Sequence, residues 1–101
     1  MHLEMDCDVC GDHRLVDVAR MPGVPTSLAY CRPCAEANAH PWVILVVDTA
    51  LSGGLGHATA AWRNMVMDTC RHLGRPFERF LLDVETEMRS QRDFGREALK
   101  S

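Results

Sequence analysis

The chain of 101 residues is long enough for one small domain, and its hydrophobic fraction of 47% is typical of a globular protein rather than a disordered one. Its formal net charge of −3 argues against a protein that binds nucleic acid through a broad basic surface. The longest apolar run, 42–47, is too short to span a bilayer, and the acidic start lacks the regions of a signal peptide. We therefore expect a cytoplasmic protein without a membrane segment.

Four of the five cysteines form two C-x-x-C pairs, Cys7/Cys10 and Cys31/Cys34, separated by residues 11–30. The odd number of cysteines argues against a simple disulfide framework. One C-x-x-C turn brings two thiolates to a cation, and a second pair completes the tetrahedron that zinc favours. Because four cysteines leave no open coordination position, the pattern predicts one structural zinc ion.

The segment between the pairs has the composition of a β-hairpin that ends in a short helix. The runs 13–21 and 26–31 favour strands, and the turn signal Pro22–Pro25 separates them. Pro33 suits the first turn of a helix, where its missing N–H is not needed. The expected order is therefore a zinc knuckle, a β-hairpin, and a second knuckle at the start of a helix.

Residues 42–51 fit either a strand or a helix. The β-branched run and Pro41 favour a strand, whereas the Gly53-Gly54 terminator favours a buried helix. We favour the helix, because no partner strand follows.

Two amphipathic helices are predicted after residue 54. The first ends at Gly74 and has an apolar stripe of Trp62, Met65, Val66, Thr69, Cys70 and Leu73. The second begins at Pro76 and has the stripe Phe77, Phe80, Leu81, Val84 and Met88. We expect Cys70 to act as a small buried hydrophobe, Trp42 and Trp62 to pack in the core, and His2, His57 and His72 to lie at the surface without partners.

The order of CDVCG, hairpin, YCRPC and helix resembles that of treble-clef zinc fingers over roughly residues 5–40. The resemblance implies that Cys7, Cys10, Cys31 and Cys34 are the zinc ligands. The longer run PGVPTSLAYCRPCAEANAHPW is also similar to small uncharacterised zinc-binding proteins of actinobacterial bacteriophages, a likeness that brings no activity with it.

The expected fold is α+β and mainly helical, in a single domain of residues 1–101. A treble-clef-like zinc hairpin module, 1–40, precedes about three helices, 41–92, that share one core with it. Residues 93–101 are expected to be a frayed tail or a small contact segment, because Phe94 lies off the stripe and Gly95 follows it.

Scattered histidines permit a catalytic alternative. The His-Asn-His endonucleases also resemble treble clefs, and Asp12, His13, Asn38 and His40 offer the residue types of such a site. His13, however, follows Cys10 by only three positions, earlier than the catalytic histidine of that family. Exposed turn residues and a helix cap explain the same residues more simply.

A basic row at helical spacing permits a second alternative, a nucleic-acid-binding regulator. Acidic residues interleave with this row, which favours a solvated, salt-bridged face instead. The row consists of Arg89, Arg92, Arg96 and Lys100. The favoured function is therefore that of a zinc-stabilised, non-enzymatic binding or adaptor protein that contacts another protein or a second copy of itself through its helices. The resemblance to bacteriophage proteins implies a phage origin.

Overall fold

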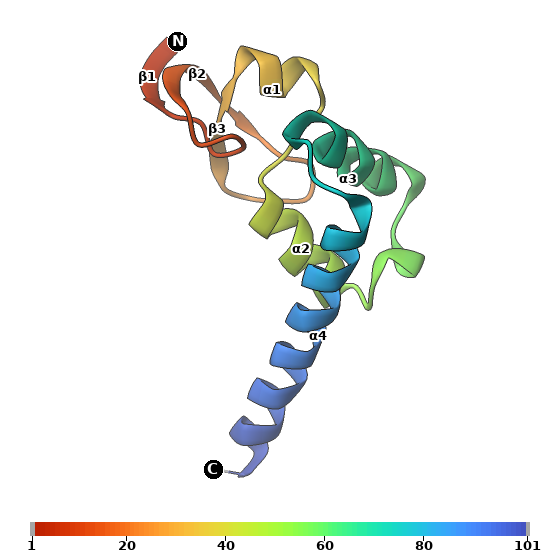
Figure 1. The fold of residues 1–101 in the computed structure, drawn as a ribbon. Coiled ribbons are helices and arrows are strands. Elements are labelled where there is room, and N and C mark those ends of the chain that lie inside the picture. The colour runs from red at the N-terminus through yellow and green to blue at the C-terminus, as the bar shows by residue number, and fades with distance from the viewer. Residues whose placement is uncertain (1, 101) are drawn as a thin grey trace.

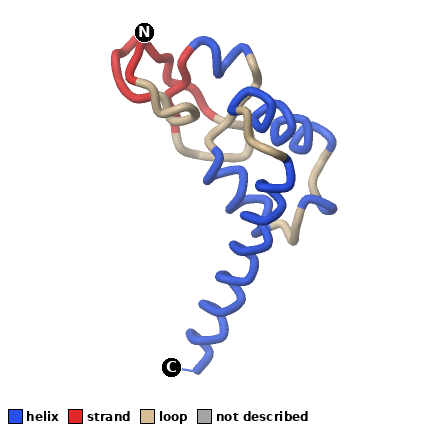
Figure 2. Tube along the Cα trace, viewed as in Figure 1, coloured by secondary structure: helices blue, strands red, loops and turns tan. Residues whose placement is uncertain are grey.

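The computed structural model describes the backbone of residues 2–100 and the side chains of residues 3–95. The strands and the short helix that follows them gather at one end of the molecule, and the later helices gather at the other (Figures 1 and 2). This arrangement confirms the expected α+β class. The elements are β1 (His2–Asp6), β2 (His13–Arg20), β3 (Ser27–Cys31), α1 (Arg32–Glu36), α2 (Trp42–Leu51), the 3-10 helix η1 (Leu55–His57), α3 (Ala60–Leu73) and α4 (Phe77–Lys100).

The strands form one antiparallel sheet in the order β1-β2-β3. The β2–β3 hairpin agrees with the sequence, and its register sets Val16 opposite Cys31. Strand β1, which pairs Asp6 with His13, was not expected. The described side chains of β1 are exposed, Leu3 and Met5 included, so backbone hydrogen bonds to β2 hold this strand rather than burial of its side chains. We call residues 2–37 the cysteine module.

Residues 42–51 are the helix α2, as favoured from the sequence, and α2 begins after Pro41. It ends where Gly53 and Gly54 adopt φ angles of 92° and 111°, which residues with a Cβ rarely adopt. Helix α3 begins at the N-cap Thr59, whose hydroxyl accepts the Trp62 N–H. We call residues 42–100 the helical bundle.

Buried apolar side chains from the cysteine module and the helical bundle form one core cluster. Phe80 of α4 and Leu45 of α2 are fully buried in it. Trp42 packs edge-on against Phe80 at 5.4 Å between ring centroids and donates its indole N–H to Asp83 at 2.8 Å. The Arg75 guanidinium lies 4.8 Å from the centroid of the same indole, so Trp42 is held on three sides.

Helix α4 continues to Lys100, beyond the boundary at residue 92 expected from the sequence. Its C-terminal half extends away from the body of the molecule (Figure 1), and Phe94 on it is 76% exposed. Residues 93–100 thus continue the helix, whereas Ser101 and the side chains of residues 96–100 lie outside the described residues. None of the helices in residues 2–100 combines the length and apolar character that a bilayer span needs.

Candidate metal centre

The first cysteine pair lies in a tight turn between β1 and β2. The Cys7 N–H donates to the Asp12 carbonyl, and the Gly11 N–H donates to the Cys7 carbonyl, both at 2.9 Å. Gly11 has a φ of 81°, so a glycine suits this position. These bonds close the chain on itself and bring the thiols of Cys7 and Cys10 to the same side.

The second pair lies where β3 becomes α1. Cys31 is the last residue of β3 and the N-cap of α1, and Cys34 lies in the first turn of the helix, after Pro33. The carboxylate of Asp8 accepts the Ala29 N–H at 2.7 Å, which ties the first turn to β3. The sheet and this bond together set the two pairs face to face.

The four sulfur atoms lie within 4.8 Å of one another, and those of Cys10 and Cys31 are 3.8 Å apart. A zinc ion with Zn–S bonds of about 2.3 Å has sulfur atoms about 3.8 Å apart in a regular tetrahedron. Cys7, Cys31 and Cys34 are buried, Cys10 is half-buried, and none of the cysteines forms a disulfide. The donor set and its spacing therefore fit one zinc ion.

Backbone donors and burial shift the pKa values of Cys7, Cys10 and Cys34 in different directions. Burial acts to raise the pKa of Cys7, but hydrogen bonds from the backbone at Cys10, Cys31 and Val9 outweigh it and lower that pKa to about 7. Burial raises the pKa of Cys10 and that of Cys34. Without a cation, the cluster cannot hold four thiolates near neutral pH, so metal binding would release protons.

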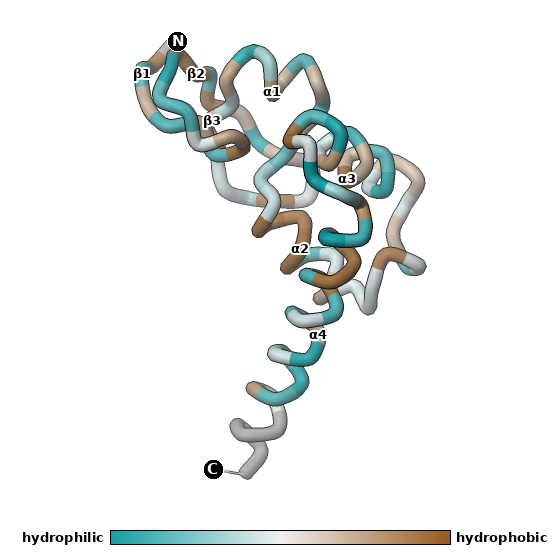
Figure 3. The backbone as a smooth tube through the Cα atoms, viewed as in Figure 1, coloured by the Kyte–Doolittle hydropathy of each residue, from teal (hydrophilic) through white to brown (hydrophobic). Residues whose placement is uncertain are grey.

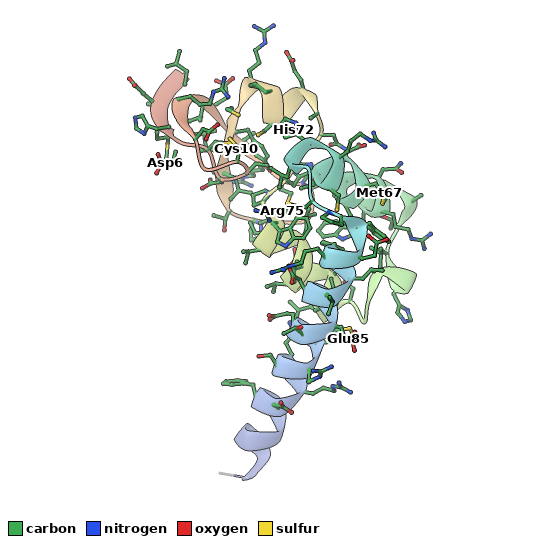
Figure 4. The ribbon with its side chains drawn as sticks, in the orientation of Figure 1. Asp6, Cys10, Met67, His72, Arg75 and Glu85 are labelled. Atoms are coloured by element: carbon green, nitrogen blue, oxygen red, sulfur yellow. The ribbon has the colours of Figure 1, made fainter. Side chains whose placement is uncertain are left out.

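His72 is a neighbour of the cluster that sequence reasoning missed. Its Nε2 lies 3.3 Å from the sulfur of Cys34, although α3 contributes none of the four cysteines (Figure 4). A neutral imidazole with its proton on Nε2 can donate to a thiolate there and stabilise its charge. The contact corrects the expectation that His72 has no partner, and no spacing rule connects His72 to Cys34.

The candidate catalytic residues fall into two separate networks. His13 lies on the exposed sheet and bonds Asp6 at 3.0 Å, whereas His40 bonds Asn38 at 3.3 Å and the Tyr30 hydroxyl at 2.9 Å. Among the described side chains, no hydrogen bond or ion pair joins His13 to Asn38 or His40. Asp12 is exposed beside the first turn. His13 thus belongs to one network, and Asn38 and His40 belong to the other.

The His40 network instead joins the cysteine module to α3. The His40 N–H donates to the Thr69 hydroxyl at 3.0 Å, and the Asn38 amide donates to Asp68 at 3.1 Å. Burial lowers the pKa of His40. Burial, followed by the charges of Asp8 and Cys7, raises the pKa of Tyr30 to about 12, so its hydroxyl remains a donor to the neutral imidazole.

The remaining cysteine has a different environment. Cys70 is buried in the core cluster, as expected for a small hydrophobe, and burial raises its pKa.

Comparisons with protein-family models, with curated proteins and with solved structures find no significant match. The four-cysteine cluster, which can hold a metal ion, is therefore the main structural indication of function.

Proposed function

We propose that this chain is a zinc-stabilised, non-enzymatic binding protein that contacts another protein through its helical bundle. The observation that carries the proposal is the closed set of four cysteine sulfurs within 4.8 Å of one another. A catalytic zinc needs a position open to water or substrate, and a tetrahedron of four thiolates offers none. The metal would then stabilise the fold, and the binding surface would lie elsewhere on the protein.

The order of elements around the cluster supports a treble-clef-like module. A first cysteine turn precedes the β2–β3 hairpin, and the second pair stands at the start of α1. Zinc in such a site would hold Cys7, Cys10, Cys31 and Cys34 and would supply cross-linking rather than chemistry. Five cysteines without a disulfide also favour a reducing compartment such as the cytoplasm.

The character of the surface favours a protein partner over nucleic acid. Two of the basic residues of α4 are balanced locally, since Arg79 pairs with Asp83 at 3.2 Å and Arg89 with Glu85 at 3.3 Å. The helical bundle exposes several large apolar side chains, which a protein partner can cover and a phosphate backbone cannot. They are Val43, Leu51, Met67, Leu81, Leu82 and Phe94.

Metal analysis tests the proposal directly. The purified protein should contain about one zinc per chain, and Cys34→Ser should lose it, whereas the control Cys70→Ala should keep it because Cys70 lies outside the cluster. A folded protein that is free of metal would contradict the proposal. So would metal-dependent cleavage of nucleic acid that His13→Ala abolishes while zinc content is unchanged.

A further inference from the structure

Helix α2 is apolar on nearly all sides, yet one of its faces is exposed to solvent. Its sequence is WVILVVDTAL, and the face with Leu45, Val46 and Ala50 is buried against the core. On the other side, Val43 is 70% exposed and Leu51 is 68% exposed. A helix that is hydrophobic all round is normally covered all round. Figure 3 shows the brown, hydrophobic course of α2 beside the first turns of α4.

Two hollows lie along this bare face. The first, of about 390 Å³, is lined by the turn 23–26, Leu28 and the α2 residues Val43, Ile44, Val47 and Asp48. The second, of about 370 Å³, is bounded by Leu51, His57, Thr59 and Trp62. Gly23 and Asp48 line both hollows, so the two adjoin, and we call them together the Asp48 groove. Each hollow has the size of a small binding pocket.

Asp48 is the charged residue of α2, and it stands where the two hollows meet. Asp48 is half-buried as a residue, and its carboxylate has no ion pair or hydrogen bond among the described side chains; the bond from the Ser52 hydroxyl goes to its backbone carbonyl. Arg63, one position after Trp62, donates instead to the carbonyls of Leu55 and Ala58. A carboxylate without a partner between apolar groove walls attracts a cation.

We propose that the Asp48 groove binds a short extended segment of another protein in which a lysine or arginine adjoins an aliphatic side chain. The aliphatic group enters the hollow beside Leu28 and Ile44, and the cation pairs with Asp48. The Trp62 ring, which lines the other hollow, can contact the same cation. The carboxylate disfavours phosphate-bearing ligands at the same place. This inference rests on the proposed protein-binding function and names the partner's chemistry.

A peptide selection tests the groove with the full zinc-loaded chain. A displayed library of random peptides is selected against the wild type, against Asp48→Lys, and against Asp93→Lys, which makes the same charge change on exposed α4. The wild type and Asp93→Lys should enrich peptides with a basic residue beside an aliphatic one. Synthetic versions of these peptides should bind Asp48→Lys at least about tenfold more weakly in fluorescence anisotropy, a loss of about 1.4 kcal/mol. Circular dichroism and zinc content establish that each variant is folded.

Several outcomes would contradict the proposal that the Asp48 groove binds such a segment. They are the absence of enriched peptides, enriched peptides without a basic residue, and equal affinity for the wild type and Asp48→Lys. A second copy of the chain is the competing occupant, because Arg92 and Phe94 on α4 offer a cation and an apolar ring. Dimerisation in sedimentation that both Asp48→Lys and Arg92→Glu abolish would assign the groove to that copy. Peptides that bind every groove variant equally would refute the groove and leave the proposed protein-binding function standing.

Discussion

The cysteine module and the helical bundle are stabilised by different means. In the module, β2 buries only Val16 among its eight residues, and the most deeply buried positions include Cys31 and Cys34 themselves. In the bundle, Phe80, Leu45 and Val66 are fully buried apolar side chains. We therefore propose that the module depends on cross-linking by a metal, whereas the bundle depends on removal of apolar surface from water.

This difference predicts which perturbation destabilises each part of the molecule. Structural zinc contributes on the order of 10 kcal/mol to small modules, and loss of one large core side chain costs about 3–5 kcal/mol. A chelator should thus act on the module before the bundle, and a core substitution should act on the bundle without removing a ligand.

Chelation of zinc, or Cys34→Ser, should have the largest effect. Amide protection should disappear first in β2 and β3, because β2 buries only Val16 and Cys31 of β3 would lose its cross-link to the other sulfur atoms. Hydrogen exchange read residue by residue measures the loss, with Cys70→Ala as the matched control. If the sheet stays protected without metal, the module has another source of stability and the comparison fails.

Phe80→Ala should lower the free energy of unfolding by about 3–5 kcal/mol, because it leaves a cavity where α4 meets Trp42. Zinc stoichiometry should stay at that of the wild type, since the substitution removes no ligand. Urea unfolding followed by circular dichroism gives the free energy. Leu82→Ala, at a position 60% exposed on the same helix, is the control and should change it by no more than about 0.5 kcal/mol.

His72→Ala should weaken zinc binding by about tenfold, because Cys34 loses the donor that stabilises its thiolate. Competition with a chromophoric chelator measures the affinity. His72→Gln, which keeps a donor, should recover part of the loss, and His57→Ala should leave zinc affinity unchanged. Equal affinity for the wild type and His72→Ala would mean that the 3.3 Å contact has no influence on the metal.

The smallest effect should come from acidification. Burial lowers the pKa of His40 in the folded protein, so the unfolded chain binds the proton more readily. The stability linked to His40 is therefore fully present above the unfolded pKa of about 6.5 and is lost as the pH falls toward the folded value. His40→Gln should flatten this part of the curve. The difference between the two proteins, with zinc content measured at each pH, separates His40 from the cysteines, and identical curves would contradict the assignment.

The sequence predicted those features that follow from local spacing. The helical stripes ending at Gly74 and beginning at Pro76, and the hairpin between the cysteine pairs, correspond to α3, α4 and β2–β3. The meeting of Cys7 and Cys10 with Cys31 and Cys34 also follows from two matched turns. Their ligation of zinc stays a prediction that metal analysis can test.

Features that depend on tertiary placement had no local signal. Strand β1 is short and exposed, and it pairs through its backbone. The contact between His72 and Cys34 joins residues 38 positions apart in the sequence. Residues 42–51 were ambiguous because they are apolar on nearly every face, and that same property produces the bare side of α2. An ambiguous secondary-structure pattern and an uncovered surface thus have one cause.

The placement of the aromatic residues has an optical consequence. Trp42, enclosed by Phe80, Arg75 and Asp83, and Trp62 are the two tryptophans of the chain, and both belong to the helical bundle. The one tyrosine, Tyr30, lies on β3. Excitation at the red edge of indole absorbance therefore reports on the bundle alone, and tyrosine-sensitised emission reports on the distance between the sheet and the helices. The two parts can be followed separately in one unlabelled sample as zinc is withdrawn.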